Sequence, residues 1–447
     1  MNYQEFKDCI AKEAKTAGVE VYDLFYSHGD SVDVYVYEGV VDNFSSNTHT
    51  GICFRCLVDG KMGLSHTQLL SEDEAKRLVK DAKEATEVLS PTKDAQIYKG
   101  GGTYLLNEPS EEESPSVDVL KELAFSMEKR AQNADPRVIS VPYSVAEFRL
   151  HEEAIFNSYG VDLKNRQTTY TIISEVVVEE NGQKKDALEY ETRSALHELS
   201  PEDVVDKAVK RALSTLGGSS VSSGKIPVVF ENRVVCSLLE AFAGIFSGDA
   251  ARKGMSLLAN EVGNPVAATT ITIVDDPLYL DSPYRSAFDD EGVPTYRKNI
   301  VENGVLKTLL YDLESASAMG VETTGNGRKG SYSSSVSVSP FNLYLEPGTL
   351  SQKELFEKAK NGVFVTGVKG LHASANAATG DFSLEANGFT IENGEKGRAA
   401  EQFTIAGNFY EFLKTAETLG NDFYFQDNIG APSLLIEKMD IAGSGEN

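Results

Sequence analysis

The amino-acid sequence, 447 residues long, predicts an α+β protein with an N-terminal domain of strand meanders packed with helices and a C-terminal, mostly β domain. Helical spacing of apolar residues is confined to a few segments, whereas short alternating apolar and polar runs, bounded by Gly, Asn, Asp or Pro, recur along the whole chain. A Gly- and Ser-rich stretch at residues 217–224 predicts a domain boundary. We therefore expect domains at residues 1–217 and 225–447.

The N-terminal domain is predicted to hold two successive units of helix, strand meander and helix, at residues 1–90 and 116–217. In the first unit a helix covers residues 2–17, and a second helix begins at Ser71, where Ser-Glu-Asp-Glu has the form of a capping box. The strands between them are expected to be separated by turns, the first at residues 28–30. These strands are predicted at residues 19–26, 31–37, 40–46 and 51–58.

The second unit is predicted to begin with a helix over residues 116–133 and to end with a helix that has Ser200 as its cap, Pro201 at its first position and Gly217 after its end. An Asn-Gly pair at residues 181–182 predicts a hairpin turn. Residues 96–115, which contain a Gly-Gly-Gly run, are expected to form a loop. The strands of this unit are predicted at residues 138–150, 152–157, 161–178 and 186–192.

The C-terminal domain is expected to start with a buried strand at residues 225–230 and a helix over residues 234–246. That helix carries apolar residues at three- and four-residue spacing and one carboxylate among them, Glu240, before a turn at Ser247-Gly-Asp249. Short strands are predicted at residues 271–274, 305–311, 341–346, 362–369, 381–387 and 402–408. Helices are predicted at residues 313–319, 351–360 and 409–418.

Composition excludes several classes of function. The net charge of −26, from 42 basic and 68 acidic side chains, disfavours direct nucleic-acid binding. No apolar run reaches the ~18 residues of a membrane span, and the polar N-terminus is unlike a secretory signal, so a cytoplasmic protein without membrane contact is expected. Cys53 and Cys56 form a C-x-x-C pair on a predicted strand, where residues three apart point to opposite faces, which disfavours one shared metal.

Several segments of the second half, taken together and in order, resemble the TldD/PmbA family, proteins once called modulators of DNA gyrase and regarded as metallopeptidases. The resemblance spans nearly the whole chain and is most specific after residue 280. The segments that carry it are Ser286–Pro294, Asn303–Leu306, Leu309–Asp312, Thr324–Arg328, Asn342–Gly348, Thr379–Ser383 and Ile391–Gly394.

The resemblance also interprets the helix at residues 234–246. In the zinc-bearing branch of the family this helix carries His-Glu-x-x-x-His followed by Gly-Asp, and alignment on Gly248-Asp249 places the two histidines at Leu239 and Gly244, with Glu240 retained. The cysteine that completes the metal site corresponds to residues 427–433, which contain none. The resemblance therefore implies the PmbA (TldE) branch, with no metal or other cofactor expected on this chain.

Other motifs favour no separate chemistry. The two His-Glu pairs, at His151 and His197, lack a second histidine at helical spacing. Residues 325–330 match G-x-G-x-x-G, but their loop-like flanks disfavour a dinucleotide site. We expect Gly325, Asn326, Gly327 and Arg328 to contact a partner or a peptide instead, with Arg328 and Lys329 meeting a carboxylate or simply lying in a solvated loop.

The resemblance implies a zinc-less subunit that pairs with a zinc-bearing TldD-type homologue, or with itself, to process or degrade extended peptides. Two alternatives stay open. The chain is an active metallopeptidase with non-standard ligands, in which Glu240 is the general base; without a metal this carboxylate is expected to be a hydrogen-bonded structural group. Or the chain is a homodimeric module that binds peptides along a strand edge.

Overall fold

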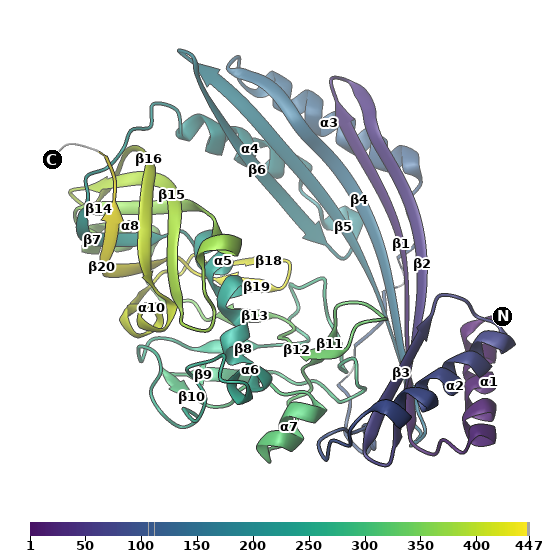
Figure 1. Cartoon of the computed structure of the whole chain (residues 1–447). Helices are drawn as coiled ribbons and strands as arrows, with labels where there is room; N and C mark the ends of the chain where they lie inside the picture. Colours follow the sequence, from purple (N-terminus) through teal and green to yellow (C-terminus); the bar gives the residue numbers. More distant parts are fainter. Residues whose placement is uncertain (106, 111, 445–447) are drawn as a thin grey trace.

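The computed structural model describes residues 1–105, 107–110 and 112–444 and confirms an α+β protein (Figure 1). The predicted loop at residues 96–115 includes residues 106 and 111, which lie outside the described residues. The strands of both N-terminal units join in one antiparallel sheet with the order β3-β2-β1-β4-β5-β6. Its strands are β1 (Tyr22–Tyr37), β2 (Val40–Val58), β3 (Lys61–Thr67), β4 (Val138–Asn157), β5 (Asp162–Glu180) and β6 (Gln183–Arg193).

The strands of this long sheet are more continuous than predicted. The turn expected at residues 28–30 is wrong, because β1 runs straight through it. His28 pairs with Thr50 of β2 and with Glu152 of β4. Neighbouring strands on both sides use the backbone groups of this segment, so the local turn preference of Gly and Asp is overridden. The expected breaks near residues 46–51 and 150–152 are likewise absent from β2 and β4.

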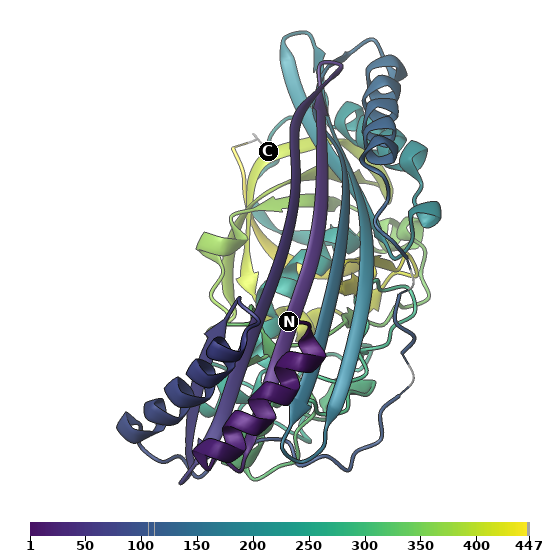
Figure 2. The same cartoon turned by 90° about the vertical axis from the view of Figure 1, so that its right-hand side faces the viewer.

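One face of the long sheet carries the helices and the other faces the C-terminal domain (Figures 1 and 2). In β1, Leu24 packs with the first helix pair and Val34 with the second, whereas Phe25 joins a cluster with Phe288 of the C-terminal domain. Cys53 and Cys56 lie on opposite faces, as predicted. The helices are α1 (Tyr3–Ala17), α2 (Glu72–Val88), α3 (Val117–Ala134) and α4 (Pro201–Ser214).

Local signals set the helix ends and turns only in part. The side chain of Ser71 accepts a hydrogen bond from the Glu74 amide, as predicted, but the Glu74 carboxylate binds Arg77 and Thr67 rather than closing the capping box. Ser200 makes no side-chain cap hydrogen bond, although Pro201 begins α4. The hairpin turn at residues 181–182 is confirmed by left-handed φ values of 54° and 80°.

The C-terminal domain contains a six-stranded sheet with the order β16-β15-β14-β7-β20-β17, in which β16 also pairs with β20, so that five strands close into a ring. Apolar side chains of this ring pack against α5, the helix predicted at residues 234–246. The strands are β7 (Gly224–Phe230), β14 (Gly362–Lys369), β15 (Asp381–Glu392), β16 (Glu395–Asn408), β17 (Thr418–Leu419) and β20 (Leu434–Ala442).

A second sheet of this domain has the order β10-β9-β8-β13-β19-β18, and β11 pairs with β12. The strand predicted at residues 305–311 is mostly wrong: only two of its residues form β10, and the following apolar residues are buried by packing without a ladder. The strands are β8 (Ile273–Asp275), β9 (Lys298–Glu302), β10 (Val305–Leu306), β11 (Gly327–Lys329), β12 (Val336–Val338), β13 (Leu343–Leu345), β18 (Tyr424–Gln426) and β19 (Ile429–Ala431).

The remaining helices are short. The helix predicted at residues 313–319 is confirmed as α7, and Ser351 forms the capping box of α8. No helix among the described residues combines the length and apolar character needed to span a membrane. These helices are α5 (Asn232–Phe242), η2 (Ala243–Phe246), α6 (Gly248–Arg252), α7 (Leu313–Met319), α8 (Gln352–Ala359), α9 (Leu371–Ser374) and α10 (Phe409–Thr415), with η1 (Leu196–Glu198) in the N-terminal half.

Candidate functional site

Helix α5, which carries the sequence-predicted site positions, lies between the closed ring of strands and the long sheet (Figure 1). The predicted helix ends early, at Phe242, and the chain continues as the 3-10 turn η2. Leu239 is 3% exposed and belongs to the apolar core, as the three- and four-residue spacing requires. Glu240 and Gly244 lie on the exposed side of the same helix and turn.

The surroundings of Glu240 and Gly244 are open. Within the part of the chain that the structure describes, the Glu240 carboxylate forms no hydrogen bond, so the expectation of a hydrogen-bonded structural group is wrong; its exposed position allows water to solvate it instead. A Cβ atom added at Gly244 would meet no atom within 4 Å. The helix thus presents a free carboxylate and an unobstructed backbone to the space beside it.

The C-terminal stretch that the resemblance aligns with the metal-binding cysteine does lie against α5. The hairpin of β18 and β19 packs on the helix, with Cys236 Sγ 3.8 Å from the Tyr424 carbonyl oxygen and 3.9 Å from that of Ile429. Ser433 accepts a hydrogen bond from the Asn232 amide at 3.0 Å and donates one to Asp422 at 2.6 Å. Segments about 190 to 200 residues apart in the sequence therefore meet at one place.

The side chains at this place do not fit a zinc ion. Zinc sites in enzymes use three protein ligands with nitrogen, sulfur or oxygen donors. Leu239 offers an alkyl group inside the core, Gly244 offers no side chain, and residues 427–433 contain no thiol. Across residues 1–105, 107–110 and 112–444, no three His, Cys, Asp or Glu side chains are grouped to hold a metal ion.

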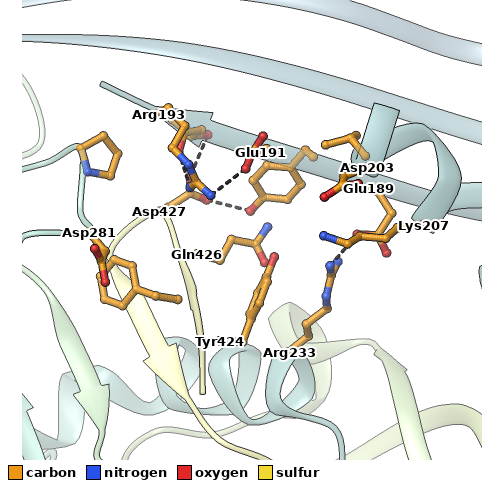
Figure 3. Close-up of a pocket in the computed structure, with 15 residues that line it drawn as sticks. Glu189, Glu191, Arg193, Asp203, Lys207, Arg233, Asp281, Tyr424, Gln426 and Asp427 are labelled. Carbon is orange, nitrogen blue, oxygen red and sulfur yellow. Dashed lines mark hydrogen bonds and ion pairs between the residues drawn. The ribbon is translucent and has the colours of Figure 1, made fainter. Parts of the chain in front are cut away.

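Next to the hairpin, a polar pocket opens between the two domains (Figure 3). We call it the hairpin pocket; its volume is about 100 Å³, and β6, α4, α5 and the β18–β19 hairpin form its walls. Tyr190 on β6 donates a hydrogen bond to the carboxylate of Asp427 at 2.7 Å, and Thr192 donates to the same carboxylate at 3.3 Å. Asp427 occupies a left-handed turn position, with φ of 54°.

Charges in the hairpin pocket are paired across the domain boundary. Arg233 of α5 lies 2.5 Å from the buried carboxylate of Glu189 on β6, and its guanidinium stacks on the ring of Tyr424 at 4.6 Å. Burial raises the pKa of Tyr190, and the charges of Asp427 and Glu240 raise it further. The Tyr190 hydroxyl therefore stays protonated and acts as a donor at neutral pH.

Sequence reasoning missed the hairpin pocket because its members come from elements far apart in the chain. Glu189 and Tyr190 alternate with other polar residues on a predicted strand, and Arg233 precedes the apolar run of α5. None of these positions forms a short motif, and only the approach of β6 to the hairpin joins them.

The glycine-containing stretch at residues 325–328 is held within the chain's own charged network. The Asn326 amide donates to Asp275 at 2.8 Å, and the Gly327 amide donates to Asp289 at 2.8 Å. Gly325 has φ of 66°, and a Cβ there would lie 2.6 Å from the Pro294 carbonyl oxygen, so glycine is needed at this close approach.

Arg328 pairs with a carboxylate of its own chain: its Nε lies 3.5 Å from Asp290. The ammonium group of Lys329 instead donates to the carbonyl oxygen of Ser334 at 2.5 Å, while the Lys329 backbone amide donates to Asp290 at 2.6 Å. Asp290 therefore fixes both residues in place. Arg328 also lines a pocket between the domains.

A second charged cluster joins the domains through the segment at residues 286–294. Arg55 of β2 lies 2.5 Å from Asp23 and 3.2 Å from Glu291. Glu291 also accepts a hydrogen bond from the Leu313 amide at 2.8 Å. Burial raises the pKa of Glu291 to about 7, against the opposing effect of the Arg55 charge. This family-like segment therefore docks the C-terminal domain onto the long sheet.

Comparisons with known proteins match most of the chain. Three family models match in succession: PmbA/TldA metallopeptidase domain 1 at residues 22–86, the central domain at residues 110–216 and the C-terminal domain at residues 223–443. The Metalloprotease PmbA of Escherichia coli O157:H7 is 28% identical over 436 residues, which cover 96% of this chain and 93% of that protein. The Metalloprotease PmbA homolog of Haemophilus influenzae is 31% identical over 73% of this chain and 70% of its own length.

Solved structures give the same result. A Thermotoga maritima protein named for modulation of a DNA gyrase is 31% identical, with a TM-score of 0.91 over 99% of this chain and 100% of its own. TldE from Thermococcus kodakarensis is 25% identical, with a TM-score of 0.88 over 98% of this chain and 99% of its own. Sequence, fold and domain order together place this chain in the PmbA/TldD metallopeptidase family.

Proposed function

We propose that this protein serves proteolysis as a zinc-less subunit, which pairs with a zinc-bearing homologue or with a second copy of itself to process extended peptides. The observation that carries the proposal is the chemistry of α5 and its hairpin. Where the metal ligands of the active branch are expected, this chain has a core leucine, a glycine and a cysteine-free hairpin. Such a subunit contributes walls and substrate contacts while its partner supplies the metal.

A groove beside α5 supports a role in peptide contact. Its volume is about 780 Å³, and it is lined by Gly244, Ala250, Met255 and residues 373–378 and 381–383. Most of these lining residues are Gly, Ala or Ser, and a groove with mostly small side chains has room for the main chain of an extended peptide. The groove begins at Gly244, on the exposed side of the degenerate metal helix.

A free strand edge supports the pairing of subunits. β3 pairs only with residues 52–58 of β2, and within the described residues no strand covers the outer edge of residues 40–51. Val40 and Phe44 on this stretch are 61% and 46% exposed. An exposed apolar strand edge is a ready surface for a partner strand, and a stable pair buries more than about 1,000 Å².

The decisive experiment compares the purified chain with its mixture with a zinc-bearing TldD-type homologue. Zinc content is measured for each, and cleavage of an unfolded polypeptide is followed by mass spectrometry. We expect no stoichiometric zinc on this chain, and cleavage only by a zinc-bearing complex. About one zinc per chain, together with cleavage by this chain alone, would instead establish the active metallopeptidase with non-standard ligands.

The pairing surface has its own test. Phe44→Asp places a charge on the free edge of β2 and is expected to abolish co-purification with the partner. If this edge is the pairing surface, cleavage by the mixture falls with it. Val88→Asp, at a residue 88% exposed at the end of α2, is the matched control and leaves both unchanged. Undiminished pairing and cleavage by the Phe44→Asp protein would refute this surface.

A second candidate function is a homodimeric peptide-binding module. β6 favours it, because this strand of eleven residues is an edge strand of the long sheet and borders the hairpin pocket. A peptide added to that edge would gain main-chain hydrogen bonds. Binding of a fluorescent unfolded peptide by the isolated homodimer, without cleavage and without a homologue, would favour this module over the proteolytic subunit.

A further inference from the structure

A pocket of about 350 Å³, separate from the α5 groove, lies between the long sheet and the C-terminal domain. We call it the Arg328 pocket. β4 and β5 supply one wall, and the segment before Phe288, β11 and the turn of the β18–β19 hairpin supply the others. Its principal lining residues are His151, Glu153, Gln167, Tyr284, Arg285 and Arg328.

The guanidinium of Arg328 is held in a fixed orientation at this pocket. Its guanidinium lies over the ring of Phe341, 4.3 Å from the centroid, and its Nε is buried 3.5 Å from Asp290. The side chain is nevertheless 33% exposed, and its terminal nitrogens form no hydrogen bond within the described residues. Stacking and the ion pair thus fix the planar group while its outer donors stay free.

Two further donors border the same space. The guanidinium of Arg285 forms no ion pair among the described residues, while the Arg285 carbonyl oxygen is fixed by hydrogen bonds from Asn107, Asn165 and Gln167. Burial, with the charge of Asp427, raises the pKa of Tyr284 to about 12, so its hydroxyl remains a donor at neutral pH.

The carboxylates near the pocket are already engaged. Glu153 is 12% exposed and pairs with His151 at 2.9 Å, whereas His151 is 43% exposed. Asp290 is 4% exposed and accepts from the Lys329 amide at 2.6 Å. Asp427 lines both this pocket and the hairpin pocket, and it accepts hydrogen bonds from Tyr190 and Thr192. The guanidinium groups of Arg285 and Arg328 therefore keep free donors at the pocket, whereas each of these carboxylates already has a partner.

We infer that the Arg328 pocket binds a singly charged carboxylate, held by Arg328 and Arg285. A guanidinium fork matches the two oxygens of a carboxylate. A phosphate dianion has the same oxygens but meets stronger repulsion from the three nearby carboxylates. The ligand is the C-terminal carboxylate of a peptide or a small free carboxylic acid. That the carboxylate comes from a peptide rests on the proposed function, whereas binding of a carboxylate group does not.

The test is calorimetric titration of the full chain with acetylated trialanine, its C-terminal amide, acetate and inorganic phosphate. We expect the peptide acid to bind and the amide to bind at least about tenfold more weakly, because it lacks the charge. Arg285→Ala and Arg328→Lys are each expected to weaken binding of the acid about tenfold or more. Arg130→Ala, which removes an exposed pair with Asp206 between α3 and α4, is the matched control and leaves binding unchanged.

The outcomes separate the two sources. Acetate that binds as tightly as the peptide acid would support the pocket and identify a small acid as its ligand. Failure of the peptide acid and acetate to bind, phosphate that binds more tightly than both, or affinity unaffected by either arginine variant would overturn the inference. The titration needs no partner, metal or cleavage, so its failure is distinguishable from failure of the proposed subunit role.

Discussion

Glu240 and Glu291 both lie in segments that carry the family resemblance, and their surroundings differ completely. Glu240 is exposed on α5 and forms no hydrogen bond within the described residues. Glu291 is 4% exposed, pairs with Arg55 at 3.2 Å and accepts from the Leu313 amide at 2.8 Å. One carboxylate is exposed to solvent on the surface of α5, and the other joins two domains. Segments that identify the same family therefore contain carboxylates with quite different environments, one solvated and one buried in an ion pair.

The energetic expectation follows from burial. Removal of one member of a buried charge pair leaves its partner without solvent or counter-charge, which is costly. An exposed carboxylate is solvated whether or not it has a partner, so its replacement changes little. The comparison predicts that the free energy of unfolding depends strongly on the Glu291 cluster and only weakly on Glu240.

The largest expected effect is that of Arg55→Ala. The change leaves Asp23 and Glu291 buried without their common counter-charge, so we expect a loss of about 3–5 kcal/mol in the free energy of unfolding. Urea denaturation followed by circular dichroism measures it. Arg77→Ala, which removes exposed pairs with Glu74 and Asp81, is the control and costs at most about 1 kcal/mol. Equal losses in both variants would contradict the distinction between the two kinds of site.

Stability should also depend on pH through Glu291. Burial raises the pKa of Glu291 in the folded protein to about 7, whereas an unfolded glutamate titrates near ~4.3. Between these two pH values the folded state binds more protons than the unfolded state. The contribution of Glu291 to the free energy of unfolding is therefore fully present below about pH 4 and is lost as pH rises through about 7. The shift corresponds to about 4 kcal/mol.

The measurement compares unfolding of the wild-type protein and of Glu291→Gln between about pH 4 and pH 8. Subtracting the free energy of unfolding of one protein from that of the other cancels the contribution of groups that titrate alike in both. One such group is Asp135, whose pKa lies at about 2 beside Arg137. We expect the free energy of unfolding of the wild-type protein to fall, relative to that of Glu291→Gln, as pH rises. A difference that is constant with pH would show that Glu291 does not change its protonation on folding.

Restoring the two aligned histidines separates the two sides of α5. Leu239→His puts a polar ring into the apolar core and is expected to cost about 2–5 kcal/mol. Gly244→His enters open space and is expected to cost less than about 1 kcal/mol. Thermal unfolding of the two single variants gives the comparison. If Leu239→His were the milder change, the helix orientation described above would be wrong.

The smallest expected effect on stability is that of Glu240→Gln, below about 0.5 kcal/mol, because the carboxylate is exposed and has no partner among the described residues. For a zinc-less subunit, peptide cleavage by the mixed complex is also expected to stay within a few-fold of the wild type. A fall of 10²-fold or more in cleavage by this chain alone would identify Glu240 as a general base and support the enzyme alternative.

Sequence alone determined the elements whose signals are local. The Asn-Gly hairpin at residues 181–182, α7 at residues 313–319 and β14 at residues 362–369 lie where propensity, capping and alternation placed them. The sequence also predicted the apolar face of α5. It showed that Leu239 and Gly244 have no side-chain atom able to bind a metal, because this depends only on which residue is present. The resemblance, carried by ordered motifs, gave the family.

Tertiary structure decided what depends on neighbours distant in the chain. Residues 28–30 look like a turn, yet they continue β1 because strands on both sides take up their backbone groups. Arg55 and Glu291 are 236 residues apart, and Arg328 lines a pocket with His151 only because the domains dock. Local preferences are worth tenths of a kcal/mol to about one, and the burial of charges and apolar surface between domains outweighs them, so only the folded chain fixes these positions.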